Sequence, residues 1–492
     1  MNALRLLDWI RGGMRHGGGV RWRRAAVTAL ALLATANSTP SRPQPPAAAA
    51  PTPSATPAPG VPRQLGEAVR TGAGASYSAG QYVGPGTCAS ANCHGNAEPG
   101  QTHDVLQNEF GTWFHQDPHR RAGEPLFNAQ SRLIAKNLGL AGPPDRSQRC
   151  LVCHALDVPA RAQAVPLELA DGISCESCHG PAGGWLARHN ETGWSHQDSL
   201  TAGMVDLRDP RGRARVCLGC HGGKPGQQVD HELLAAGHPE LVFELDNYTE
   251  SMPAHWLPFA ERRDTEGRRD SHGLAAWAVG QAETFRSGLL LLRHRAASDR
   301  WPEFAELTCD TCHHDLATGR WRQVRGYRYR AGLPSWSPAR WAVLRHLVAA
   351  AAPQERAALD AEMEKLAEQI ARLNTPAARL TETCERIAAG LDRALPQIAG
   401  TDWSERSAHD LLAALAHDRA YLEAADRESA EQTALAVQSL VAFLSERRPS
   451  VARGPLPKHV RELFAELDDP NRFDRQRFGE RLGELERSLP PR

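Results

Sequence analysis

Ten of the eleven cysteines form five closely spaced pairs, and a histidine directly follows the second cysteine of each pair. Four pairs have the spacing Cys-x-x-Cys-His, and the first pair has four residues between its cysteines. Two thiols can add to the two vinyl groups of a haem, and the adjacent histidine can then bind the iron as its proximal ligand. The pattern therefore predicts five covalently bound c-type haems (haem c). The attaching cysteines are Cys88, Cys93, Cys150, Cys153, Cys175, Cys178, Cys217, Cys220, Cys309 and Cys312, and the proximal histidines are His94, His154, His179, His221 and His313.

Three other kinds of site use paired cysteines, and each explains the sequence less well. A zinc site gives no reason for a histidine after every second cysteine, and a thioredoxin-like redox pair needs a single copy in a βαβ setting. A disulfide that closes a two-residue loop would be an unusual choice to repeat four times. The eleventh cysteine, Cys384, lies in a helical pattern, and we expect it to be a buried apolar side chain.

Five irons need up to five distal ligands, and histidines outside the motifs are the main candidates. Only two methionines, Met204 and Met252, lie in the motif-bearing region, which favours mostly bis-histidine iron with low reduction potentials. The histidines of that region outside the motifs are His103, His115, His119, His189, His196, His231, His238, His255, His272, His294 and His314.

Five segments carry a resemblance to a known family: Tyr82–Gly84, Cys88–His94, Trp113–His119, Gly172–Ala182 and Gly237–Leu241. They resemble multihaem c-type cytochromes related to the tetrahaem cytochrome that accepts electrons from hydroxylamine oxidoreductase. The resemblance covers about residues 82–315. It departs from the relatives at two points, because this chain has five motifs rather than four and a wider first motif.

The resemblance implies which histidines are distal ligands. By match to the family these are His119, His189 and His238. His255, which precedes Trp256, is a fourth candidate on weaker grounds. His115, His196 and His231 are lesser alternatives. Which distal histidine serves which haem stays open at this point.

The elements that position these residues are expected to be helical. Glycine and proline are abundant between the motifs, which predicts short helices that carry the motif histidines, joined by long irregular loops. Five haems in residues 81–335 leave too little chain for a separate apolar core around each, so the haems themselves should organise this domain. The expected fold class is mainly α, with a five-haem cytochrome c domain followed by a helical C-terminal region.

The C-terminal region, residues 336–492, has no cysteine motif and has apolar residues at helical spacing, as in Leu344, Leu347 and Val348. This periodicity predicts three to six amphipathic helices. Their breaks are expected near Pro353, Pro376, Pro396 and Pro449.

The N-terminal residues predict export. A basic stretch precedes the apolar run of residues 25–36, which is too short to span a bilayer and fits a signal peptide over residues 1–36. Residues 37–80 are rich in proline and alanine and are expected to form a disordered linker. These features predict a periplasmic protein, with anchoring to the membrane by an uncleaved signal as the alternative.

Charge and chemistry together indicate the class of function. The chain has 57 basic and 57 acidic residues, and this balance argues against a nucleic-acid partner. We expect electron transfer between redox proteins, including a membrane-associated donor or acceptor, rather than catalysis. The alternative is a multihaem oxidoreductase that acts on a small nitrogen or sulfur compound at one open-coordinate haem.

Overall fold

The computed structural model describes residues 77–490, except for 101–104, 258–272, 310–311, 314–334 and the single residues 338, 373 and 425. The predicted signal peptide and almost all of the predicted linker lie outside the described residues, as do His103, His272 and His314. Export therefore stays a prediction from sequence.

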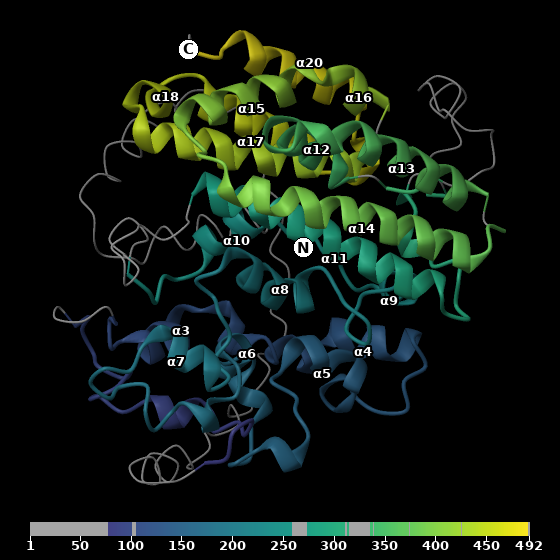
Figure 1. The fold of residues 1–492 in the computed structure, drawn as a ribbon. Coiled ribbons are helices and arrows are strands. Elements are labelled where there is room, and N and C mark those ends of the chain that lie inside the picture. The colour runs from purple at the N-terminus through teal and green to yellow at the C-terminus, as the bar shows by residue number, and fades with distance from the viewer. Residues whose placement is uncertain are drawn as a thin grey trace, which may run out of the picture.

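The predicted mainly α architecture is confirmed. The described residues contain helices and three isolated β-bridges, Tyr82 with Gln163, Lys224 with Gln227 and Leu307 with Trp336, but no sheet. Helices α3–α7 occupy the lower part of the molecule in Figure 1, and the longer helices α12–α20 the upper part. Helices α8, α10 and α11 lie between these two parts.

Short helices and 3-10 turns make up the motif-bearing part. The α-helices are α3 (Glu109–Gln116), α4 (Ala129–Asn137), α5 (Gln148–His154), α6 (Cys175–His179), α7 (His196–Thr201), α8 (Pro210–His221), α9 (His231–Ala236) and α10 (Leu245–Ser251). The 3-10 turns are η1 (Pro85–Cys88), η2 (Pro118–Arg121), η3 (Glu124–Phe127), η4 (Pro144–Arg146), η5 (Ala160–Ala162), η6 (Leu169–Asp171), η7 (Ala182–Gly184) and η8 (Phe304–Glu306).

Helical geometry explains how three motifs present their side chains. Helices α5, α6 and α8 each end on the proximal histidine of a motif. The two cysteines and the histidine are therefore at positions i, i+3 and i+4, which share one face of a helix. A single planar cofactor can meet all three side chains on that face.

The motif-bearing part has little apolar core of its own. One cluster consists of Val83, Ala182 and Trp185, and another contains Ala214, Leu218, Phe243 and Leu245. The C-terminal helices, in contrast, share one continuous core that extends from Leu274 to Leu485. Small clusters of this kind agree with the expectation that haem fills the interior of the motif-bearing part.

The C-terminal helices form a bundle that includes one helix from before residue 336. Helix α11 (Leu274–Ala296) packs along α14 and also contacts α8, so it joins the two parts of the molecule. The remaining helices are α12 (Trp341–Ala351), α13 (Pro353–Ala371), α14 (Ala377–Gly400), α15 (Glu405–His417), α16 (Arg419–Ala424), α17 (Arg427–Arg447), α18 (Pro449–Arg453), α19 (Leu456–Leu467) and α20 (Arg475–Arg487), with the 3-10 turn η10 (Pro470–Arg472) before α20.

Three of the four proline breaks occur as predicted, and more helices form than expected. Pro353 and Pro449 begin α13 and α18, and Pro376 is the N-cap residue of α14. The break expected at Pro396 is wrong, because this proline lies inside α14 near its end. The described part of residues 336–492 contains nine α-helices rather than three to six, since short turns without proline also divide the chain.

Ion pairs to a buried glutamate lie at the junction between the two parts. Glu283 of α11 has only 1% of its side chain exposed and pairs with Arg211 and Arg215 of α8. Arg340, just before α12, donates to the backbone carbonyl of Phe243 at 3.1 Å. Among the described residues, none of the helices has the length and apolarity that a membrane span requires.

Candidate haem-binding sites

The proximal histidines of the first two motifs are oriented by hydrogen bonds at Nδ1. His94 donates to Glu109 Oε2 at 3.0 Å, and His154 donates to the backbone carbonyl of Ala122 at 2.6 Å. A histidine that donates through Nδ1 has its lone pair on Nε2, which is the nitrogen that then binds a metal. Both rings are therefore prepared to bind iron through Nε2.

Three of the predicted distal histidines have the same orientation. His119 donates from Nδ1 to Asp117 Oδ1 at 2.9 Å. The Nδ1 atoms of His189 and His238 donate to the backbone carbonyls of Leu186 at 2.7 Å and Pro239 at 2.8 Å, respectively. In each case Nε2 is the atom left to bind a metal.

Two pairs of rings have the separation expected for axial ligands. Two imidazoles that bind one metal from opposite sides, each with a nitrogen–metal distance of about 2.0–2.1 Å, have ring centroids about 6.4 Å apart. The centroids of His94 and His189 are 6.1 Å apart, with 13° between the planes. Those of His119 and His221 are 6.0 Å apart, with 82° between the planes. A metal with an imidazole on each side tolerates either angle, because rotation of a ring about its nitrogen–metal axis leaves the distance between the two centroids unchanged.

Charge interactions link His255 with His179 of the third motif and His238 with His154 of the second motif. Burial lowers the pKa of His179 to about 4, with smaller contributions from the charges of His255 and His94. Burial also lowers the pKa of His238, and His154 contributes to the same shift. A lowered pKa keeps the imidazole neutral at physiological pH, which metal binding requires.

The lesser alternatives have different surroundings. His196 uses Nε2 to contact Asp206 Oδ1 at 3.2 Å, so the nitrogen that would bind iron is occupied. His115 is exposed on α3. His231, ranked below the four main candidates, lies beside His313 of the fifth motif.

Cysteines of different motifs lie together. The thiols of Cys88 and Cys175 are in hydrogen-bonding contact, and so are those of Cys153 and Cys220. The first motif therefore adjoins the third, and the second adjoins the fourth. Cys93, Cys309 and Cys312 are exposed, and Cys384 is buried in the bundle as expected.

Buried thiols connect the third and fourth motifs. Burial raises the pKa of Cys178 to about 12, and Cys217 of the fourth motif contributes to the shift. Burial raises the pKa of Cys217 to about 11. The adjacency of motifs is thus first, third, fourth and second.

Part of this chain is similar to a known protein family. Residues 88–180 match the family model for cytochrome c554 and c-prime. The match includes the first three motifs and confirms the family resemblance over these residues. This cytochrome c554-like domain is a multihaem c-type cytochrome domain, which implies bound c-type haem, electron transfer and redox partners. Comparison with curated proteins and with solved structures found no match.

A buried carboxylate holds the cytochrome c554-like domain together at its third motif. Glu176, between Cys175 and Cys178, is 3% exposed. It accepts hydrogen bonds of 2.8–3.0 Å from the backbone N–H groups of Val83, Gly84 and Ala182. Burial raises the pKa of this carboxyl, which the three donors oppose. Sequence reasoning missed this residue, because a glutamate between two motif cysteines is exposed in the ordinary case.

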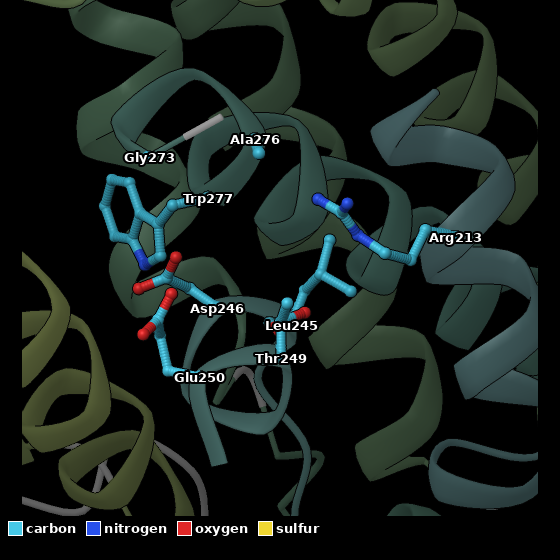
Figure 2. A pocket seen from close by; sticks show the side chains of 8 residues that line it. All are labelled: Arg213, Leu245, Asp246, Thr249, Glu250, Gly273, Ala276 and Trp277. Atoms are coloured by element: carbon cyan, nitrogen blue, oxygen red, sulfur yellow. Dashed lines mark hydrogen bonds between the residues drawn. The ribbon is translucent and has the colours of Figure 1, made fainter. Parts of the chain in front are cut away.

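A small cavity lies beside helix α8, outside the residues 88–180 that match the family model. It lies between α8, α10 and α11, where Asp246 and Glu250 lie together beside the Trp277 indole, with Arg213 across Leu245 (Figure 2). Burial raises the pKa of Asp246 well above its usual range, and the neighbouring carboxylates add to the shift. The cavity volume of about 20 Å³ holds one or two waters, so this is a structural junction.

Proposed function

We propose that this protein carries single electrons between redox proteins through five covalently bound c-type haems with mostly bis-histidine iron. The match over residues 88–180 supports bound haem and electron transfer. The proposal goes beyond this match in three respects: the number of haems, their axial ligands and the periplasmic location.

The pairing of histidines carries the proposal. Two motif histidines have a distal candidate at the separation of an axial pair, His189 for His94 and His119 for His221. We assign His238 to His154 and His255 to His179, because a charge interaction within each pair contributes to a lowered pKa. A haem whose two axial positions are filled by the protein suits electron transfer, whereas catalysis at the iron needs one position open to substrate. The pairs favour the carrier.

The surrounding residues fit this function. Haem iron, when bound, supplies one-electron oxidation and reduction. Glu109 and Asp117 hold the rings of His94 and His119 in the tautomer that presents Nε2, and the carbonyls of Ala122, Leu186 and Pro239 do the same for three more rings. Rings fixed in advance change little between oxidation states, which keeps the cost of reorganisation low.

The location and partners follow from the sequence. The predicted signal peptide would deliver the chain to the periplasm, where its cysteines could receive haem, and redox proteins there or at the membrane would be its donor and acceptor. Whether the signal is cleaved or retained as an anchor can be tested by N-terminal sequencing of the mature protein.

The test is haem counting combined with ligand binding on the purified, mature protein. We expect a pyridine haemochrome assay to return five haems per chain and the optical spectrum to be low-spin and unchanged by carbon monoxide. A His189→Ala variant, which opens one axial position, serves as the positive control for carbon monoxide binding. A wild-type high-spin haem that binds carbon monoxide, together with turnover of hydroxylamine, nitrite or tetrathionate, would instead establish the enzyme.

A further inference from the structure

We propose that His231 is the distal ligand of the fifth haem, which makes this haem six-coordinate and places it between the cytochrome c554-like domain and the C-terminal bundle. The inference rests on the proposed function in one respect: it requires a haem at the motif of Cys309, Cys312 and His313. The motif lies outside the matched residues 88–180.

The two rings have the geometry of an axial pair. The centroids of His231 and His313 are 6.4 Å apart, and their planes are inclined by 29°. Two imidazoles on one metal have centroids about 6.4 Å apart. This separation matches the pairs His94 with His189 and His119 with His221.

The backbone of His231 is held from several directions. Its N–H donates to Glu303 Oε1 at 2.9 Å. Asp230, the N-cap residue of α9, accepts from the N–H of Leu233 at 2.9 Å and pairs with Arg149 at 2.6 Å. Such support on the backbone fixes the position of a ligand before the metal binds.

An exposed aromatic ring lies against His231 and suits a haem surface. The Phe304 ring contacts His231 edge to face, with centroids 5.6 Å apart. Phe304 is 50% exposed, and among the described residues it is one of only four exposed large apolar side chains. The flat apolar face of a porphyrin bound between His231 and His313 would cover this ring.

The surroundings connect the fifth haem with both parts of the molecule. Arg149, which pairs with Asp230 beside His231, directly precedes Cys150 of the second motif. Helix α9 begins at His231, and His238, the partner of His154, follows its end. The carboxyl group of Glu428 in α17 hydrogen-bonds the thiol of Cys309. The fifth haem would thus lie between the second motif and the C-terminal bundle, at the end of the series of haems.

The test uses the holoprotein with His231→Ala and a matched control, His196→Ala. Thioether bonds retain the haem, so both variants should contain five haems per chain. We expect His231→Ala to convert one fifth of the haem to a high-spin form that binds carbon monoxide. The control should stay fully low-spin, because His196 already bonds Asp206 through Nε2.

Two further variants keep the test decisive. His231→Met, which keeps a ligand in place, should remain low-spin but raise the potential of one haem, since thioether ligation favours the reduced iron. In a Cys309→Ser, Cys312→Ser background, the high-spin signal of His231→Ala should disappear.

Two results would overturn the inference, and they differ in what they leave standing. If His231→Ala keeps five low-spin haems, another residue is the ligand and the carrier function is unaffected. If the wild-type protein has only four haems and the missing one belongs to the Cys309 motif, both this inference and the five-haem proposal are wrong, although electron transfer through four haems remains.

Discussion

At the scale of single residues, the histidines differ in what accepts their Nδ1 hydrogen. Carboxylates accept it from His94 and His119, and backbone carbonyls accept it from His154, His189 and His238. A carboxylate makes the imidazole a stronger donor to the metal, which favours oxidised iron. The first and fourth motifs should therefore bind the haems of lower potential.

Glu109→Gln tests this difference. Burial opposes ionisation of Glu109, but the hydrogen bond from His94, the charge of His94 and the backbone hydrogen bonds together outweigh it and lower the pKa of this carboxyl, so the native group is a carboxylate at neutral pH. The neutral amide should raise the potential of one haem by up to about 60 mV, which for one electron is a tenfold change in relative ligand affinity. Spectroelectrochemical titration measures the shift. Glu98→Gln, an exposed change nearby, should leave all five potentials unchanged, and a shift of equal size in this control would refute the explanation.

At the scale of elements, close packing of helices depends on where glycine occurs. Helix α11 contains Gly280, where an added Cβ would lie 2.8 Å from Leu245 Cδ2 and 2.9 Å from its Cβ. The same helix contains Gly288, where an added Cβ would meet no atom within 4 Å. The contact of α10 with α11 therefore requires glycine at position 280 but not at position 288.

The two glycines give a prediction with opposite signs. Gly280→Ala should lower the free energy of unfolding by about 1–3 kcal/mol, because Leu245 is buried and can move little. Gly288→Ala should raise it by about 0.5–1 kcal/mol, because alanine favours the helix. Thermal or urea unfolding followed by circular dichroism measures both changes. Destabilisation of similar size at both positions would show that helix α11 is limited by something other than this contact.

At the scale of the whole molecule, the bundle and the motif-bearing part meet through charged residues, among them the buried Glu283. Glu283 pairs with two arginines of α8, and Glu428 of α17 contacts Cys309 of the fifth motif. Burial raises the pKa of Glu428 to about 8, and Asp426 and Glu240 add to the shift. This carboxyl should make the stability of the joined molecule depend on pH.

The sign of that dependence follows from proton binding. In the unfolded chain a glutamate ionises near pH 4.3. Between about pH 4.3 and 8 the folded protein retains a proton that the unfolded chain has released, so the contribution of Glu428 to stability is lost as pH rises.

Glu428→Gln should remove this loss. The free energy of unfolding of the variant minus that of the wild type should therefore be at least about 1 kcal/mol larger at pH 8 than at pH 5. Urea unfolding of the holoprotein at the two pH values measures the difference. Glu446→Gln, an exposed position in the same helix, should show no such dependence. Equal effects of Glu428→Gln at both pH values would mean that the carboxyl ionises normally.

The sequence by itself determined the chemistry of attachment, since cysteine and histidine spacing within a motif is local and survives any fold. It also determined the helical class and three of four helix breaks, because hydrophobic period and proline act over a few residues. Tertiary structure alone decided which histidine faces which motif, the neighbourhood of His231 and His313, and the burial of Glu176. Those contacts join residues as far apart in the chain as His119 and His221, and sequence spacing carries no information about such distances. The packing of α11 was likewise set by the tertiary structure, because α11 contacts α14 of the bundle and α8 of the motif-bearing part, which are distant from each other in the chain.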